Sequence, residues 1–184
     1  MHGVLEYAEE INETLAKIIG TADESAFQQL TSEIGKANRV FVYGKGRSGI
    51  VMRMFAMRLM HLGLTAYVVD ETTTPAVAKN DLLLIASGSG KTGACQHIAR
   101  LAKDAGASVG LITATSGSAI AQNSDFTVVL PVGTVVFQST ASRQFGGTYF
   151  EQVLLIGLDA VIAYLREMSG VSFEFMQSRH SNLE

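Results

Sequence analysis

The sequence has little of several residue types that would direct it to particular structural classes. It contains one cysteine, Cys95, among 184 residues, which excludes a disulfide framework and a thiolate metal cluster. We expect Cys95 to be a small buried or half-buried side chain without a chemical role. Charged residues make up only 17% of the chain, the net charge is -3, and no basic stripe could release counterions from a polyanion. We therefore expect no nucleic-acid partner.

Long hydrophobic runs are also missing. The longest apolar run, residues 153–163, is interrupted by Asp159 and is shorter than the roughly 20 residues that a membrane helix needs. The first 13 residues are polar and acidic, so we expect no signal peptide, no membrane partner and a cytoplasmic location. The chain is nevertheless 47% hydrophobic. This content predicts one well-buried domain with additional apolar surface that is covered between subunits.

The hydrophobic pattern predicts two helices before any strand, and then strands that alternate with helices. Asp23 is expected to cap the second helix. The five expected strands cover residues 39–43, 65–69, 81–86, 107–113 and 126–130. The expected helices cover residues 4–19, 23–37, 48–62, 92–105, 119–123 and 148–168, and residues 172–184 form a short tail.

Strands that are continuous apolar runs between helices indicate an α/β fold with a parallel sheet covered on both faces. We predict a single domain over residues 1–184: a doubly wound three-layer sandwich with a five-stranded parallel sheet, preceded by two helices. The first and third strands should be adjacent in the middle of the sheet. The parts of this domain are the N-terminal helices (1–38), the sheet core (39–131), and a C-terminal part (144–168) that holds the long helix. A polar loop (134–147) leads into that helix.

Two loops rich in glycine and serine follow the first and third strands, at residues 44–49 and 87–92. Because these strands should be neighbours, their loops are expected to meet at the carboxyl edge, where the sheet changes direction and ligands bind. Backbone N–H groups, hydroxyls and a helix N-terminus together suit an anion, which we take to be the phosphate of a small sugar phosphate. The predicted phosphate ligands are Ser48 and the run Ser87-Gly88-Ser89-Gly90-Lys91-Thr92.

Three other interpretations of these loops are weaker. Gly90-Lys91-Thr92 matches the end of a P-loop, but Ile85 stands where that motif requires its first glycine. Residues 44–49 match the dinucleotide fingerprint G-x-G-x-x-G, and Asp70 ends the next strand as a ribose-binding acid would. Two helices precede the first strand, however, and no substrate domain follows the sheet. The loops could also be no more than tight turns, which their predicted convergence disfavours.

A general base is needed if the site is catalytic. Glu151 lies in the first turn of the long helix, on an otherwise apolar segment, where it could equally be a capping carboxylate stabilised by the helix dipole. His180 lies near the C-terminus, where chains usually fray. The histidines have no metal-ligand spacing, so we predict no metal site.

Several segments together resemble the 6-phospho-3-hexuloisomerases, small members of the sugar isomerase (SIS) domain family. The resemblance spans nearly the whole chain, and the closing segment is its most specific part. Its motifs are Gly44-Lys45-Gly46-Arg47-Ser48-Gly49, residues 56–63, Asp70-Glu71-Thr72-Thr73-Thr74-Pro75, Ser87-Gly88-Ser89-Gly90 and Arg179-His180-Ser181-Asn182-Leu183-Glu184. The chain departs from the family pattern at Lys91, Gly93 and Ser181, where Glu, a hydroxyl residue and Ala are usual.

The resemblance implies interconversion of D-arabino-hex-3-ulose 6-phosphate and D-fructose 6-phosphate, a step of the ribulose monophosphate pathway, without a cofactor. It implies a homotetramer with sites between subunits. Glu151 would be the proton-shuttling base, and His180 would come from a neighbouring subunit. Arg47 or His180 would steady the developing oxyanion or move the hydroxyl proton. A non-catalytic sugar-phosphate sensor is the alternative, although such modules normally carry an output domain, and a dinucleotide-binding protein is a weaker one.

Overall fold

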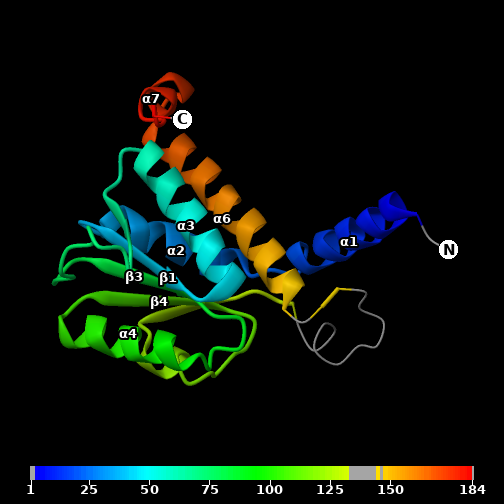
Figure 1. Cartoon of the computed structure of the whole chain (residues 1–184), viewed down its shortest axis with the longest axis horizontal. Helices are drawn as coiled ribbons and strands as arrows, with labels where there is room; N and C mark the ends of the chain where they lie inside the picture. The colour runs from blue at the N-terminus through cyan, green and yellow to red at the C-terminus, as the bar shows by residue number, and fades with distance from the viewer. Residues whose placement is uncertain (1–2, 133–143, 146, 184) are drawn as a thin grey trace.

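The computed structural model describes residues 3–132, 144–145 and 147–183. Its centre is a five-stranded parallel sheet with the strand order β2-β1-β3-β4-β5. This order confirms the predicted fold class and the predicted adjacency of the first and third strands (Figure 1). The strands are β1 (Val40–Gly44), β2 (Ala66–Val68), β3 (Leu82–Ala86), β4 (Ser108–Thr113) and β5 (Phe126–Val129).

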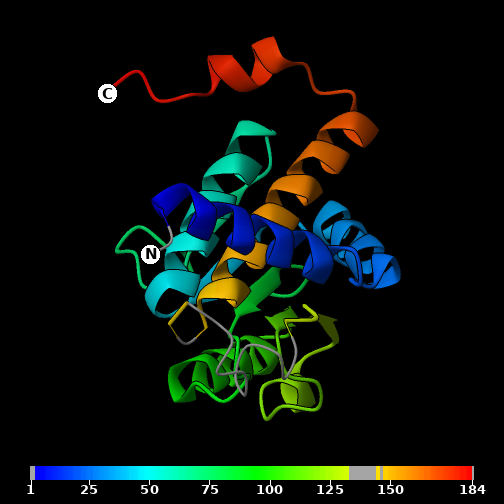
Figure 2. The same ribbon diagram turned by 90° about the vertical axis from the view of Figure 1, so that its right-hand side faces the viewer.

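Helices cover both faces of the sheet, as the apolar strands require. The helices α2 (Glu24–Lys36), α3 (Gly46–His61) and α6 (Thr148–Ser169) pack on one face. The other face is covered by α4 (Gly93–Asp104) and the short 3-10 helix η1 (Ala121–Asn123) (Figure 1). The first helix, α1 (Val4–Ile19), contacts α6 and then extends away from the body of the molecule (Figures 1 and 2).

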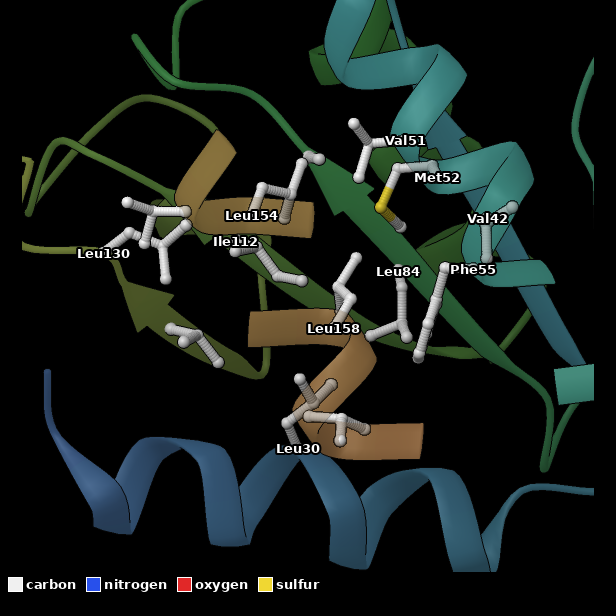
Figure 3. Packing of buried hydrophobic residues seen from close by; sticks show 14 of the residues in the cluster. Leu30, Val42, Val51, Met52, Phe55, Leu84, Ile112, Leu130, Leu154 and Leu158 are labelled. Carbon is white, nitrogen blue, oxygen red and sulfur yellow. The ribbon is translucent and has the colours of Figure 1, made fainter. Parts of the chain in front are cut away.

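Side chains along each strand alternate between two hydrophobic clusters because successive residues of a strand point to opposite faces. On β3, Leu82 and Leu84 belong to the cluster below α3 and α6, whereas Leu83 and Ile85 belong to the cluster against α4. Leu84 is fully buried, so its truncation to alanine should cost about 2–5 kcal/mol. Figure 3 shows the larger cluster, to which α2, α3 and α6 contribute Leu30, Val51, Met52, Phe55, Leu154 and Leu158.

The helix α6 has the length and hydropathy that a membrane-crossing helix would need, judged by those two properties alone. One of its faces is buried against the rest of the domain. The buried residues of this face are Tyr149, Phe150, Val153, Leu154, Leu158, Val161 and Ile162. The helix also carries the exposed side chains Ile156, Tyr164 and Met168, and 39% of its apolar window is buried.

Element boundaries follow the predictions to within one or two residues, with two informative differences. The helix α3 begins at Gly46, two residues earlier than predicted, so most of the supposed loop 44–49 is its first turn. The predicted tail contains a further helix, α7 (Phe173–Ser178), which the pattern analysis missed. Ser172 caps this helix, because its Oγ accepts a hydrogen bond of 3.1 Å from the N–H of Phe175. Most of the polar loop predicted over residues 134–147 lies outside the described residues.

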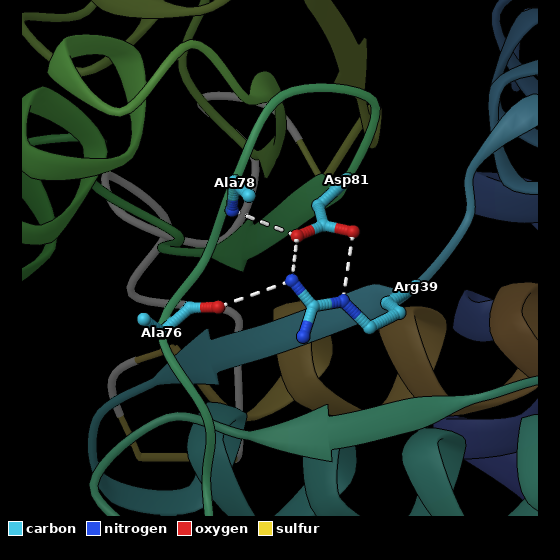
Figure 4. A network of polar contacts seen from close by, with 4 residues as sticks. All are labelled: Arg39, Ala76, Ala78 and Asp81. Atoms are coloured by element: carbon cyan, nitrogen blue, oxygen red, sulfur yellow. Dashed lines mark hydrogen bonds and ion pairs between the residues drawn. The ribbon is translucent and has the colours of Figure 1, made fainter.

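At the amino edge of the sheet, the buried Asp81 pairs with Arg39 (Figure 4). Asp81 accepts hydrogen bonds from Nε of Arg39 at 3.0 Å, from Nη2 at 2.5 Å and from the N–H of Ala78 at 2.8 Å. Arg39 also donates to the carbonyl of Ala76 at 3.1 Å. Hydrogen bonding to Asp81 raises the pKa of the Arg39 guanidinium. These contacts fasten the segment before β3 to the start of β1.

Candidate active site

The loop after β3 forms a compact turn at the carboxyl edge of the sheet. The hydroxyls of Ser87, which is buried, and Thr92 lie 3.0 Å apart, at the two ends of the loop. Ser89 accepts a hydrogen bond of 3.3 Å from the N–H of Lys91, and both residues are exposed. Gly90 has a φ of +61°, and a β-carbon there would lie 2.1 Å from Oγ of Ser118, so only glycine fits.

The two glycine-rich segments meet, as predicted. Gly44 pairs with Ala86 at the ends of β1 and β3. A β-carbon on Gly49 would lie 2.5 Å from the carbonyl oxygen of Gly44, so α3 starts in direct contact with the strand that precedes it. Ser48 lies in the first turn of α3 and is half-buried. The N-termini of α3 and α4 are therefore brought to one edge of the sheet, where an anion is favoured.

Glu151 and Arg47 form an ion pair between the first turns of α6 and α3. Nε of Arg47 donates a hydrogen bond to Oε2 of Glu151. The Glu151 side chain is 17% exposed and that of Arg47 is 65% exposed, so the carboxylate is sheltered while the cation faces solvent. A cavity of about 240 Å³ lies beside the pair and is lined by Arg47, Ile50, Val51, Glu151, Gln152 and Leu155.

The ion pair and the loop are connected through the residue that precedes Glu151. A β-carbon on Gly88 would lie 3.1 Å from the ring of Phe150, so the loop packs directly against the first turn of α6. A sheltered carboxylate, an arginine and the N-termini of two helices thus share one edge of the domain. Such an arrangement can hold a phosphate and transfer a proton at a carbon nearby. Gln152 also lines the cavity, but the sequence did not indicate it as a site residue. Its position next to Glu151 was the one available signal.

His180 lies at the opposite end of the α3–α6 layer. Nε of the preceding residue, Arg179, donates a hydrogen bond of 2.7 Å to the carbonyl of Met60. The ring of His180 stacks on that of His61, with centroids 5.3 Å apart. Since Arg47 and His61 are separated by nearly the whole of α3, about 20 Å at 1.5 Å per residue, His180 does not reach Glu151 of its own chain (Figure 1).

Asp70, on which the dinucleotide interpretation depended, is engaged with a neighbouring lysine. Lys45 donates a hydrogen bond of 2.9 Å to its carboxylate, and this bond lowers the pKa of Asp70. The pair borders a cavity of about 210 Å³ between the ends of β1 and β2. Oδ2 of Asp70 is thus engaged by a side chain of this chain's own first glycine-rich segment.

Two further observations concern cofactors. Over the ranges that the structure describes, no group of three His, Cys, Asp or Glu side chains is placed to hold a metal ion. Cys95 is fully buried in the first turn of α4, as expected, and burial raises the pKa of its thiol to about 11. A thiol in this state is neither a nucleophile nor a ready metal ligand at neutral pH.

Comparison with known proteins identifies the family. The model of the SIS domain matches residues 33–155, which include the sheet, both glycine-rich segments and Glu151. The chain belongs to the SIS domain family.

Within that family, several relatives that match nearly the whole chain share one name. The chain is 43% identical to the 3-hexulose-6-phosphate isomerase of Mycobacterium gastri, over 96% of this chain and 87% of that protein. It is 38% identical to the enzyme of the same name from Bacillus subtilis, over 97% and 98% of the two chains. A crystal structure of a Methanococcus jannaschii protein, for which the function of 3-hexulose-6-phosphate isomerase has been inferred, superimposes with a TM-score of 0.84 at 35% identity. That match covers 97% of this chain and 99% of the other.

Proposed function

We propose that this protein is a ketose-phosphate isomerase that interconverts D-arabino-hex-3-ulose 6-phosphate and D-fructose 6-phosphate. The observation that carries the proposal is the sheltered carboxylate of Glu151, paired with Arg47 and packed through Phe150 against the loop at residues 87–92. Several relatives that match nearly the whole chain are named for this reaction. The reaction belongs to the ribulose monophosphate pathway, and we place the enzyme in the cytoplasm.

The site residues divide into a binding part and a reacting part. Ser48 and residues 87–92 hold the substrate phosphate through hydroxyl groups, amide N–H groups and the N-termini of α3 and α4. A helix N-terminus contributes roughly 0.3–1 kcal/mol toward an anion, and more where it is partly buried. Several donors that act together can therefore hold a phosphate with few cations. Lys91, which is exposed, adds a positive charge at the edge of the loop.

Glu151 is the base of the proposed reaction. Its carboxylate removes the proton from C2 of the 3-ketose, and the electron pair of that bond forms the C2–C3 double bond of a cis-enediolate. The same carboxylate returns the proton to C3, while the hydroxyl proton moves from the oxygen on C2 to the oxygen on C3. Arg47 lies beside the carboxylate and stabilises the negative charge on these oxygens. Every step is a proton transfer, so no redox cofactor is required.

We further propose that His180 completes the site of a neighbouring subunit in a homotetramer. Within one chain it lies at the far end of α3 from Glu151. Exposed apolar side chains, Ile50, Met54 and Met57, lie along α3 between the two ends. If a second copy packed antiparallel on this stripe, its His180 would lie next to Arg47 and Glu151. The apolar stripe and the distance along α3 support this arrangement.

The test of the reaction is conversion of D-arabino-hex-3-ulose 6-phosphate, followed as the fructose 6-phosphate formed. Incubation with fructose 6-phosphate in deuterated water distinguishes an isomerase from a sugar-phosphate sensor. In an isomerase, the proton that the base removes from carbon exchanges with solvent before it is returned, so deuterium enters the sugar. A sensor breaks no carbon–hydrogen bond, so no deuterium enters. Binding of fructose 6-phosphate without deuterium incorporation or conversion would favour the sensor.

The shared site can be tested by mixing two inactive variants. Glu151→Gln and His180→Ala should each lose activity when assembled alone. Unfolding and refolding them together gives mixed oligomers, in which some sites combine an intact Glu151 with an intact His180 from different chains. Activity should then return. A mixture as inactive as its two components would show that His180 does not act across a subunit boundary.

A further inference from the structure

The carbonyl of Gly88, in the middle of the loop at residues 87–92, is held by three donors from the adjacent segment of the chain. It accepts hydrogen bonds from the N–H of Ala114 at 3.1 Å, from Oγ1 of Thr113 at 3.2 Å and from Oγ1 of Thr115 at 3.2 Å. A carbonyl oxygen has two lone pairs, so the three donors share them and leave none for a further donor. The direction of this carbonyl is therefore strongly fixed.

The threonine hydroxyls are themselves oriented. Oγ1 of Thr113 accepts a hydrogen bond of 3.2 Å from the N–H of Thr115, which leaves the hydroxyl proton of Thr113 available for Gly88. Thr113 is fully buried at the end of β4, and Thr115 is half-buried two residues later. The pair thus forms a rigid support, with both hydroxyl groups directed to one oxygen.

Fixing this carbonyl also fixes the next N–H group. The carbonyl of Gly88 and the N–H of Ser89 belong to one planar trans peptide, in which they point in opposite directions. A carbonyl held toward β4 therefore turns the N–H of Ser89 away from β4. Within residues 3–132, 144–145 and 147–183, no atom accepts a hydrogen bond from the N–H of Gly88 or of Ser89.

The surroundings of the loop keep this peptide from turning over. The ring of Phe150 packs against Gly88, because a β-carbon there would lie 3.1 Å from it. The N–H of Ile120 donates a hydrogen bond of 3.1 Å to the carbonyl of Gly90. The carbonyls of Gly88 and Gly90 are thus both bound by residues 113–120, and the N–H groups of Gly88 and Ser89 remain for a ligand.

We propose that Thr113 and Thr115 are positioning residues of the phosphate-binding loop. Their hydroxyl groups hold the Gly88–Ser89 peptide in the orientation that directs the N–H of Ser89 to the substrate phosphate. They act through this peptide and do not themselves touch the substrate. This role rests on the proposed function of residues 87–92 in holding the phosphate.

The experiment compares valine and serine substitutions at both positions. Thr113→Val and Thr115→Val remove the hydroxyl and keep the side-chain volume, whereas Thr113→Ser and Thr115→Ser keep the hydroxyl. Each valine variant should raise KM for the 3-ketose phosphate, and the inhibition constant of inorganic phosphate, by roughly threefold to tenfold. The kcat should stay within about twofold of the unmodified enzyme, because Glu151 is untouched. The serine variants should restore both constants.

A purely structural role predicts another pattern. If the valine variants lower the melting temperature and leave KM and the phosphate inhibition constant unchanged, the proposal is overturned. Thr127→Val on β5 is the matched control, because Thr127 makes no hydrogen bond to the loop within the described part of the chain. Should Thr115→Val fail to fold, Thr115→Ala gives the same comparison. An unmodified protein that neither converts the substrate nor binds inorganic phosphate would refute the proposed function itself, which is a separate result.

Discussion

Two arginine–carboxylate pairs lie at opposite edges of the same sheet, and they differ in how the carboxylate is satisfied. At the amino edge, Asp81 is 2% exposed and its two oxygens accept hydrogen bonds from two nitrogens of Arg39 and from a backbone N–H. At the carboxyl edge, Glu151 is 17% exposed and accepts from Nε of a solvent-facing Arg47. The first carboxylate accepts three hydrogen bonds within the protein, whereas the second accepts a hydrogen bond from Arg47 and borders a cavity.

The difference follows from where each pair lies in the fold. Asp81 joins the starts of β1 and β3 to the segment before β3, so its contacts hold chain segments together (Figure 4). Glu151 and Arg47 come from the first turns of two helices beside a cavity and the loop at residues 87–92. Similar side-chain chemistry thus serves stability at one edge and, we propose, catalysis at the other. Substitution of Glu151 should therefore lower activity, and substitution of Asp81 should lower stability.

The largest effect should come from Glu151→Gln. Loss of the base should lower kcat by roughly 10²–10⁴-fold, because proton transfer by a positioned group contributes about that much. The melting temperature and the affinity for inorganic phosphate should change little. Steady-state kinetics with the 3-ketose phosphate and a thermal melt measure the two quantities. Near-normal turnover would show that another group is the base.

Arg47→Ala should have the next largest effect. Removing one group that stabilises an oxyanion should lower kcat by roughly 10²-fold. Stability should be nearly unchanged, because ion pairs with an exposed partner contribute little. Arg47→Lys is the control that keeps the charge, and it should recover part of the turnover. An Arg47→Ala variant that loses stability rather than turnover would place this pair in the same structural class as Arg39–Asp81.

Asp81→Ala should give the opposite result. The variant loses the acceptor for Arg39 and for the N–H of Ala78, which should lower the free energy of unfolding by about 2 kcal/mol. For a chain of this size the melting temperature should fall by roughly 4–8 °C. The values of kcat and KM for the folded enzyme should not change. Calorimetry and kinetics on the same preparation test both, and a selective loss of activity would contradict the comparison.

The smallest effect concerns Cys95, which is buried near the site without a part in the proposed chemistry. Burial raises the pKa of its thiol from 9.0 to about 11. A group with a raised pKa in the folded state stabilises the fold below its ordinary pKa, and this contribution is lost as the pH rises. The free energy of unfolding should therefore fall between about pH 9 and 11, more steeply than in Cys95→Ala. Parallel slopes for the two proteins would show that the thiol ionises equally in both states.

The sheet order and most elements could be predicted from the sequence, because apolar runs bounded by glycine and polar residues are local signals. The meeting of residues 44–49 with the loop after β3 followed from the strand order alone. The missed helix α7 is only six residues long, and its Phe173 and Phe175 are exposed, so it offered no hydrophobic period to detect.

Contacts between distant residues could not be predicted in the same way. Arg47 and Glu151 are separated by 104 positions, and only the packing of α3 beside α6 brings them together. The support of Gly88 by Thr113 and Thr115 is likewise a contact between two segments, made by residues of ordinary type. For the same reason, the sequence of the long helix indicated Glu151 as a candidate base but could not predict that Arg47 pairs with it.

The contact between Gly49 and Gly44 bears on the use of the spacing G-x-G-x-x-G to recognise nucleotide-binding proteins. A β-carbon at position 49 would lie 2.5 Å from the oxygen of Gly44, so this glycine is required by the packing of a helix onto the strand before it. The spacing G-x-G-x-x-G therefore reports the steric shape of a strand-to-helix junction and not the identity of a ligand. A search that uses this spacing alone would place sugar-phosphate proteins among dinucleotide-binding ones. The residues between the glycines, here Arg47 and Ser48, are the better discriminators.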